Sequence, residues 1–315
     1  MAKISTYITS AVKYLRANDL VAVPTETVYG LGGNALNETA ISKIFEVKRR
    51  PKFDPLIAHI SDMIALDQLV TVIPEKAQKL AEHYWPGPLT LLLPKKRDVP
   101  DLLTSGSDRV AVRMPDHPLT LELLHQLDFP LAAPSANPFG YVSPTTAQHV
   151  ADQLGPDIPY ILDGGPCTVG LESSIVGFEG DEVVVYRLGG LPLEAIIEIV
   201  GPVRVNLNKS SNPQAPGMLK SHYAPGKQVI LGNLETLISQ HSDKRIGIIA
   251  FDRTFENYVQ VTLSPSGNMQ EAAANLFKAL RELDKAPLDV ILAEKVPDHG
   301  LGKAINDRLE RAAAS

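Results

Sequence analysis

Hydroxyl-bearing side chains and glycines directly follow a short apolar run near the start of the chain. Residues 20–23 are apolar, and Thr25, Glu26 and Thr27 come after them, followed by the glycine-rich stretch 30–33. Glycine lets a backbone approach another group closely, and hydroxyls both donate and accept hydrogen bonds. The pattern therefore predicts a strand that ends at a ligand-binding site. The glycines do not form GxGxxG, so a dinucleotide fingerprint is not supported.

A dense group of cations comes about twenty residues later. Lys48, Arg49, Arg50 and Lys52 place four cations within five residues, just before the apolar run 56–60. Such charges repel one another unless they are solvated or face an anion. Taken alone, the group is most often a solvated helix end, where cations also suit the helix dipole. Together with the hydroxyl cluster, it predicts a site for a polyanion beside a small polar partner.

Arginines and hydroxyls recur at the ends of later apolar runs. Arg109 and Arg113 flank one run at even spacing, so both side chains fall on one face of a strand. Guanidinium groups make paired hydrogen bonds to phosphates and carboxylates, so this composition favours ligands that carry both. Each residue alone has a plainer explanation, and His59 on its apolar run is more often a packed histidine than a catalyst. The other polar residues of this kind are Ser135, Asn137, Ser143, Thr145, Thr146, Ser173, Ser174 and Arg187.

Composition limits the class of protein. The 315 residues carry a net charge of −6, and 44% of them are hydrophobic, which is typical of a globular protein and argues against a surface that binds nucleic acid throughout. A single cysteine, Cys167, excludes an internal disulfide framework and fits a reducing compartment. The first residues lack the apolar segment of a signal peptide, and no run approaches a membrane span. These features predict a cytoplasmic protein.

The alternation of strand-like and helix-like runs predicts an α/β protein of two domains. Within the first domain, expected at 1–205, residues 38–48 show helical spacing and 173–189 read as a hairpin. Residues 206–226 lose this periodicity and gain Asn, Ser, Pro and Gly, which is typical of a linker, and we expect it to act as a lid over the site. A second, smaller α/β domain is expected at 227–315.

A set of motifs in a fixed order points to one family. The stretches PTETVYGLG, KRRPKFDPLIAHI, WPGPLTLLL, VAVRMPDHP, APSAN and GLESSIV…YRLGG resemble the YrdC-like family. The segment APGMLKSHYAP and the second domain are similar to the two-domain form found among L-threonylcarbamoyladenylate synthases. The resemblance covers essentially the whole chain. It implies a twisted mixed sheet with helices around an open cavity, and a Rossmann-like second domain.

The resemblance also implies a reaction. Members of the family join L-threonine, bicarbonate or CO₂, and ATP into threonylcarbamoyl-AMP and pyrophosphate, with Mg²⁺ accompanying ATP. A partner transferase then moves the threonylcarbamoyl group to adenosine 37 of tRNA. No Asp/Glu cluster offers the protein's own metal cage, so Mg²⁺ is expected on phosphate oxygens and water.

Roles carried over from the family fall on specific positions. Lys48 and Arg50 are implied as catalytic residues on the phosphates. The residues implied around threonine are Thr27, His59, Arg113 and Ser173. The residues implied for ATP are Arg50, Asp54, Arg109, Ala133, Ser135, Asn137, Ser143, Arg187 and Tyr223. Asp54 stands where Asn is common in the family, so its charge needs Mg²⁺ or Lys52 opposite it.

Two alternatives stay open at this stage. A carbamoyl-adenylate former of the hydrogenase-maturation type shares the YrdC-like domain, but it would need acylphosphatase and zinc-finger modules, which a chain with one cysteine lacks. A non-catalytic RNA-binding module would use the cations of 43–52 and 95–97, with salt-sensitive RNA binding and no ATP turnover. In the enzyme itself, only a weak contact with RNA is expected.

Overall fold

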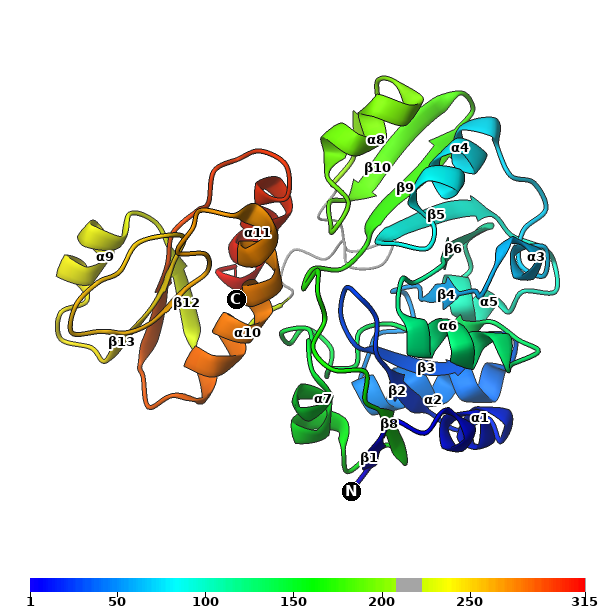
Figure 1. The fold of residues 1–315 in the computed structure, drawn as a ribbon, viewed down its shortest axis with the longest axis horizontal. Coiled ribbons are helices and arrows are strands. Elements are labelled where there is room, and N and C mark those ends of the chain that lie inside the picture. Colours follow the sequence, from blue (N-terminus) through cyan, green and yellow to red (C-terminus); the bar gives the residue numbers. More distant parts are fainter. Residues whose placement is uncertain (208–222, 315) are drawn as a thin grey trace.

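The computed structural model describes residues 1–207 and 223–314, which form two units (Figure 1). Within these residues, the N-terminal unit, 1–207, is built on an eleven-stranded mixed sheet, and the C-terminal unit, 223–314, on a four-stranded parallel sheet. The predicted fold class, a large mixed sheet with a smaller second α/β unit, is confirmed. The expected linker, 206–226, lies largely outside the described residues, so the predicted domain boundaries stay predictions.

The strands of the large sheet bring distant parts of the chain into one row. His59 pairs with Arg113, Arg113 with Thr90, Thr90 with Ile175, and Ile175 with Arg187, so five neighbouring strands contribute to a single register line. In pairing order the strands are β1 (Lys3–Ser5), β8 (Tyr160–Leu162), β2 (Val21–Val23), β3 (Gly30–Asn34), β7 (Leu131–Ala132), β4 (Ile57–His59), β6 (Arg109–Arg113), β5 (Leu89–Pro94), β9 (Ser174–Glu179), β10 (Glu182–Arg187) and β11 (Arg204–Val205).

Helices cover this sheet because each buries an apolar stripe against it. Helix α2 shows the pattern: Asn37 caps it by accepting a hydrogen bond from the Ala40 backbone at 3.0 Å, and Ile41, Ile44 and Phe45 are buried. The helices of the unit are α1 (Ile8–Arg16), α2 (Glu38–Lys48), α3 (Met63–Leu66), α4 (Glu75–Tyr84), α5 (Asp101–Thr104), α6 (Pro118–His125), α7 (Ala147–Leu154) and α8 (Leu193–Val200).

Helix α2 ends in a sharp reversal that matters for the site. Arg49 adopts a left-handed conformation with φ of 53°, so the chain turns at once after the last helical residue. As a result Lys48 and Arg50 are both buried, whereas Arg49 between them is exposed. Two of the cations in the 48–52 cluster therefore point into the protein.

The C-terminal unit is a parallel sheet with apolar strands and helices on both faces. The strands pair in the order β12 (Gln228–Leu231), β15 (Val290–Ala293), β13 (Ile246–Ala250) and β14 (Val259–Thr262). Strands such as Ile246–Ala250 are entirely buried, as expected when helices cover both sheet faces. The helices of this unit are α9 (Leu234–Gln240), α10 (Met269–Lys285) and α11 (Gly302–Ala312).

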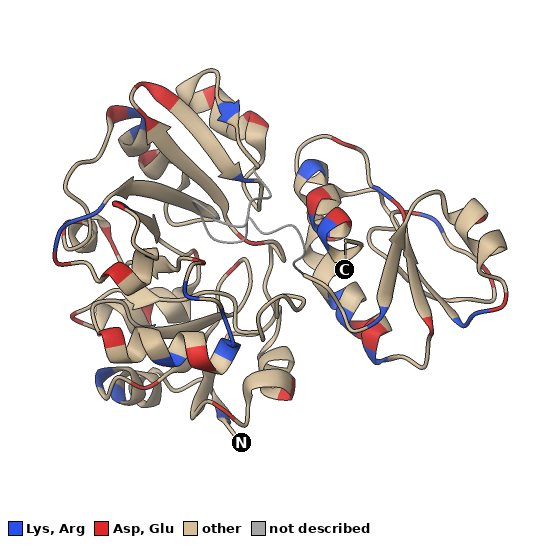
Figure 2. Ribbon diagram, turned by 180° about the vertical axis from the view of Figure 1, so that it is seen from behind, with Lys and Arg blue, Asp and Glu red and all other residues tan. Residues whose placement is uncertain are grey.

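Helices α10 and α11 face the N-terminal unit (Figure 1) and carry charges of both signs (Figure 2). Arg281 of α10 donates to the Ser143 carbonyl at 3.1 Å, and Arg308 of α11 donates to Glu172 at 2.9 Å. Ion pairs at the edges of the contact join Lys285 to Asp152 and Lys303 to Glu194. Polar contacts thus tie the two units together. Within the described part of the chain, none of the helices has the length and apolar content needed to cross a membrane.

Candidate active site

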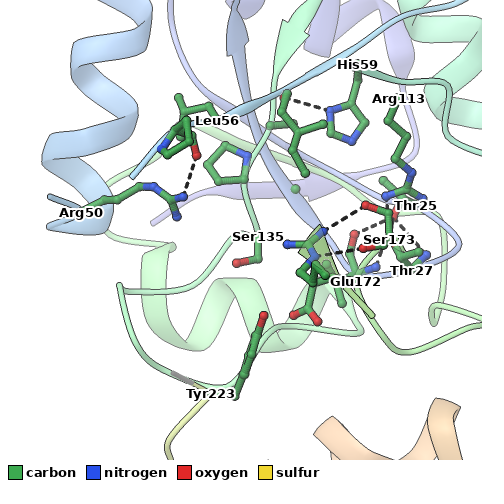
Figure 3. Close-up of a pocket in the computed structure, with 17 residues that line it drawn as sticks. Thr25, Thr27, Arg50, Leu56, His59, Arg113, Ser135, Glu172, Ser173 and Tyr223 are labelled. Atoms are coloured by element: carbon green, nitrogen blue, oxygen red, sulfur yellow. Dashed lines mark hydrogen bonds between the residues drawn. The ribbon is translucent and has the colours of Figure 1, made fainter. Parts of the chain in front are cut away.

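A pocket lies where the row of strand ends meets the loops after β2 and β7 (Figure 3). It encloses about 560 Å³ of space between protein atoms, part of it open to solvent. Thr25, Thr27, Arg113 and Ser173 gather at one side, while Arg50 lies at the opposite side. The lining residues are Thr25, Thr27, Val28, Gly30, Arg50, Pro55, Leu56, Ile57, His59, Arg113, Ala133, Pro134, Ser135, Glu172, Ser173, Arg187 and Tyr223.

Arg113 is the fixed cation of the first side. It ends β6 with 4% of its surface exposed; its Nε donates to the Gly87 carbonyl at 3.2 Å, its Nη1 donates to Thr27 Oγ1 at 2.7 Å, and its Nη2 forms an ion pair with Glu26. A guanidinium has five N–H donors, so these three bonds leave two. Arg113 is thus held rigidly and still has donors for a carboxylate.

Hydroxyls surround this cation because a tight turn and a buried network hold them. Thr25 Oγ1 accepts from the backbone N–H groups of Thr27 and Val28 at 3.1 and 3.2 Å, which forms the turn after β2. Ser173 Oγ lies 2.7 Å from Thr90 Oγ1 and accepts from Arg187 Nη2 at 3.0 Å. Burial lowers the pKa of Arg187 to about 10, so it is still charged at neutral pH.

His59 lines the pocket as a neutral side chain. It ends β4 directly opposite Arg113 in the register, and its Nδ1 lies 3.3 Å from the Ile57 carbonyl oxygen. Burial, aided by the charge of Arg113, lowers the pKa of His59 to about 3. The imidazole therefore remains uncharged near neutral pH, where it cannot serve as an efficient proton acceptor.

Arg50 and Asp54 form a buried ion pair at the other side of the pocket. Arg50 Nη2 lies 2.8 Å from Asp54 Oδ2, and Arg50 also donates to the carbonyls of Asp54 and Pro55 at 3.0 and 2.8 Å. Burial lowers the pKa of Arg50. Asp54 is fully buried and lies outside the pocket lining, and the cation that pairs with it is Arg50; its expected contact with ATP stays a prediction.

Lys48 does not reach the pocket lining, and its expected direct action on the phosphates stays a prediction. Its Nζ donates to the carbonyls of Ser135 and Asn137, both at 2.5 Å. Burial, and then the charge of Arg50, lowers the pKa of Lys48 well below its ordinary value. The ammonium group instead fixes the loop that carries Ser135 and Ala133 into the pocket wall.

Three more residues expected to contact ATP also lie outside the lining. Asn137 donates its amide to the carbonyls of Pro138 and Tyr141, and so shapes its own loop. Ser143 donates to Glu172 Oε1 at 2.6 Å, and Glu172 in turn lines the pocket. Arg109 shares a strand face with Arg113 but sits at the far end of β6, where it donates to the Tyr186 hydroxyl at 3.1 Å.

Several pocket residues were not predicted as site residues. Glu172 is the clearest case, because it lines the pocket and accepts hydrogen bonds from residues far along the chain. Leu56 and Ile57 of the apolar wall belong to the apolar run 56–60, which was predicted without a role in the site, and Pro55 was not singled out. Gly30 lets the backbone approach closely, as predicted for the glycine-rich stretch, because a Cβ there would stand 3.1 Å from the Ala133 Cβ in the pocket wall.

Comparison with known proteins identifies the family. A family model described as "Telomere recombination" (Sua5, YciO and YrdC) matches residues 13–189, and one described as "Threonylcarbamoyl-AMP synthase, C-terminal domain" matches residues 191–314. The protein named threonylcarbamoyl-AMP synthase of Pyrococcus abyssi is 44% identical over 321 residues, covering 96% of this chain and 93% of the relative. The chain belongs to the threonylcarbamoyl-AMP synthase family.

Other relatives of the family agree along the whole chain. The Bacillus subtilis threonylcarbamoyl-AMP synthase is 41% identical over 320 residues, covering 97% of this chain and 92% of that protein. The solved structure of P. abyssi Sua5 complexed with L-threonine superposes with a TM-score of 0.93 at 43% identity, covering 97% and 94% of the two chains. The resemblance and the enzyme class, a nucleotidyltransferase, are therefore confirmed.

The basic surface that the RNA-binding alternative would use at residues 43–52 is smaller in this structure than the sequence suggests. Lys48 and Arg50 are buried, and Lys43 pairs with Asp19 at 3.0 Å. Of the cations in 43–52, Arg49 and Lys52 stay exposed and Lys43 is partly exposed, so the basic patch that RNA binding would use is reduced. Catalysis, rather than RNA binding, is the function that the family and the site share.

Proposed function

We propose that the pocket binds L-threonine at its Arg113 side and ATP at the side of Arg50 and Tyr223, and forms threonylcarbamoyl-AMP between them. The observation that carries this assignment is the geometry of Arg113, a buried guanidinium with two donors left, beside the hydroxyls of Thr27 and Ser173. The guanidinium pairs with the substrate carboxylate, and hydroxyls read the substrate hydroxyl. Such a site rejects analogues that lack that hydroxyl.

The chemistry follows in two steps. The amine of threonine attacks CO₂ and gives a carbamate with release of a proton, or it attacks bicarbonate and gives the same carbamate with loss of water. A carbamate oxygen then attacks the α-phosphorus of ATP, its bond to the bridging oxygen breaks, and pyrophosphate leaves with that electron pair. Neither step requires the protein to form a covalent bond.

The side chains of the pocket act by alignment and charge rather than by proton transfer. Glu26 and Glu172 are engaged in ion pairs with arginines, and His59 has a pKa of about 3. Holding two reactants in line contributes about 7–11 kcal/mol in favourable cases, and fixed cations offset charge on the phosphates. Arg50 and Arg187 are placed to supply that charge.

Mg²⁺ is proposed to enter with ATP. Among the described residues, no group of three or more His, Cys, Asp or Glu side chains is arranged to hold a metal ion. The pocket residues therefore fit a cation carried by phosphate oxygens and water, which supplies charge neutralisation on the triphosphate. The protein contributes the arginines around it.

The wider setting is proposed on the same basis. The product is a reactive mixed anhydride, so a transferase must take it to tRNA, as the family reaction implies. A cytoplasmic setting is proposed from composition, because a chain with one cysteine, Cys167, has no internal disulfide and fits a reducing compartment. The linker expected to act as a lid lies largely outside the described residues, although Tyr223 near its end lines the pocket.

The deciding experiment measures pyrophosphate release from ATP and Mg²⁺, omitting threonine and bicarbonate one at a time. We expect release to need both. Release that ignores threonine would assign the pocket to another acceptor. Absence of release under every mixture, together with salt-sensitive RNA binding, would reject the enzymatic proposal.

A further inference from the structure

The C-terminal unit places a charged side chain directly behind the pocket wall. Arg308 of α11 is fully buried, although it belongs to the unit that does not contain the pocket. Its Nε donates to Glu172 Oε2 at 2.9 Å and its Nη2 donates to the Leu188 carbonyl at 2.8 Å. Its Nη1 pairs with Asp307 at 2.5 Å. Arg308 therefore reaches across the contact between the units and holds a residue that lines the pocket.

Arg308 also holds the aromatic ring of Tyr223. Its guanidinium carbon lies 4.9 Å from the centre of that ring, and Phe277 of α10 stacks on the ring with centroids 5.5 Å apart. Tyr223 is 1% exposed and has φ of 66°, a left-handed conformation that costs free energy in a bulky residue unless its surroundings impose it. Two helices of the C-terminal unit thus fix the ring that lines the pocket.

The charge of Arg308 has a direct consequence for the pocket. Glu172 is a carboxylate in a site proposed to receive a triphosphate, and like charges at close range repel strongly in a buried setting. Ser143 bonds one carboxylate oxygen of Glu172, and Arg308 bonds the other. Burial alone would lower the pKa of Arg308, but Tyr223, Glu172 and Asp307 raise it above its ordinary value. The guanidinium is therefore a permanent counter-charge to Glu172.

We propose that Arg308 is a positioning residue of the active site: it neutralises Glu172 and holds the ring of Tyr223 so that the pocket accepts ATP. The C-terminal unit then contributes to catalysis through one buried side chain and not only through its attachment. This inference rests on the proposed assignment of ATP to the Tyr223 side of the pocket.

A merely structural role for Arg308 makes a different prediction. If it only joined the two units, its loss would lower stability and the fraction of active molecules, so apparent kcat would fall while both KM values stayed the same. If it positions Glu172 and Tyr223, the KM for ATP rises more than the KM for threonine. The split between the two KM values separates the alternatives.

The test compares Arg308→Met with Lys303→Met in the full-length protein. Lys303 lies on the same helix and also pairs across the units, with Glu194, but its contact is partly exposed and away from the pocket. For Arg308→Met we expect the KM for ATP, and the Kd for ATP by calorimetry, to rise at least tenfold, with the threonine KM within threefold. Lys303→Met should leave every constant within twofold.

A double variant tests the charge argument. In Glu172→Gln/Arg308→Met, the uncompensated carboxylate is gone, so we expect the ATP KM to recover at least threefold relative to Arg308→Met. If the single variant does not fold, as a thermal unfolding scan would show, the double variant replaces it, with an expected ATP KM at least threefold above wild type. If neither folds, Arg308→Lys is the deciding variant, because lysine keeps the charge but cannot bond both Glu172 and Leu188 while covering the Tyr223 ring. For this variant we expect a threefold rise in the ATP KM.

An ATP KM and Kd within twofold of wild type in the deciding variant would overturn the proposal, even with normal turnover. The proposed function fails separately, if wild type releases no pyrophosphate that depends on threonine and bicarbonate. In that case the calorimetric Kd for ATP still reports on Arg308, because binding is measured without turnover.

Discussion

Replacing Arg113 by lysine tests how the pocket recognises its amino-acid substrate. Removing the cation altogether would leave Glu26, only 6% exposed, without a counter-charge, and breaking a buried pair in this way costs about 3–5 kcal/mol of stability. Lysine keeps the charge beside Glu26, so the fold survives. Lysine lacks the planar guanidinium, whose donors bond Thr27 and Gly87 and still include two that are left for the ligand.

The magnitude follows from the hydrogen bonds that are lost. A lysine ammonium can keep one charged hydrogen bond to the substrate carboxylate, whereas the guanidinium offers two. One hydrogen bond to a charged group is worth about 1.5–3 kcal/mol, which corresponds to a rise in the threonine KM of roughly 10- to 150-fold. The ATP KM should stay within about threefold, because Arg113 lies at the other side of the pocket.

The assay is pyrophosphate release at varied threonine and saturating ATP, with thermal unfolding as a check on folding. Arg109→Lys is the matched control, since Arg109 lies on the same face of β6 but contacts Tyr186 outside the pocket. We expect that variant to keep both KM values within about twofold. A threonine KM unchanged in Arg113→Lys, or a rise confined to ATP, would refute the assignment of the carboxylate to Arg113.

Three further predictions test the pocket. His59 has a folded pKa of about 3 against roughly 6.5 when unfolded, so at acidic pH the unfolded state binds the extra proton. The free energy of unfolding should therefore fall by about 2 kcal/mol from pH 7 to pH 5 because of His59. His59→Gln should remove that part of the change, as measured by urea titrations at both pH values. Tyr223→Ala should raise the ATP KM roughly tenfold because the pocket loses the part of its wall that the ring forms, with Tyr223→Phe close to wild type. EDTA should abolish pyrophosphate release and added Mg²⁺ restore it, while desalted protein should retain substoichiometric Mg²⁺ by elemental analysis.

Residue types and periodicity predicted much of the fold. The hairpin expected at 173–189 forms as β9 and β10, and the helix expected at 38–48 is α2 with the same bounds. These succeed because a hairpin and a capped amphipathic helix are set by local sequence. The placement of polar residues at strand ends was also informative, since Arg113, Ser173 and Arg187 all reach one pocket.

Sequence reasoning was less informative where the position along an element, or a distant contact, decides the outcome. Even spacing correctly put Arg109 and Arg113 on one face, but only the sheet register tells which end of β6 reaches the pocket. The left-handed turn at Arg49 buries Lys48 and Arg50, which the run of cations did not reveal. Glu172 was not predicted as a site residue because its partner Arg308 follows it by 136 residues, and no local pattern connects the two.

The same buried pair couples two positions in evolution. A lineage that lost the C-terminal unit would leave the Glu172 carboxylate with the Ser143 hydroxyl but without its cation. Such a chain gains by exchanging the glutamate for an uncharged residue, after which a regained unit would bring an arginine that lacks its carboxylate partner across the contact and keeps Asp307 as its ion-pair partner. Among homologues, an acidic residue at 172 should accompany an arginine at 308, and the two should disappear together.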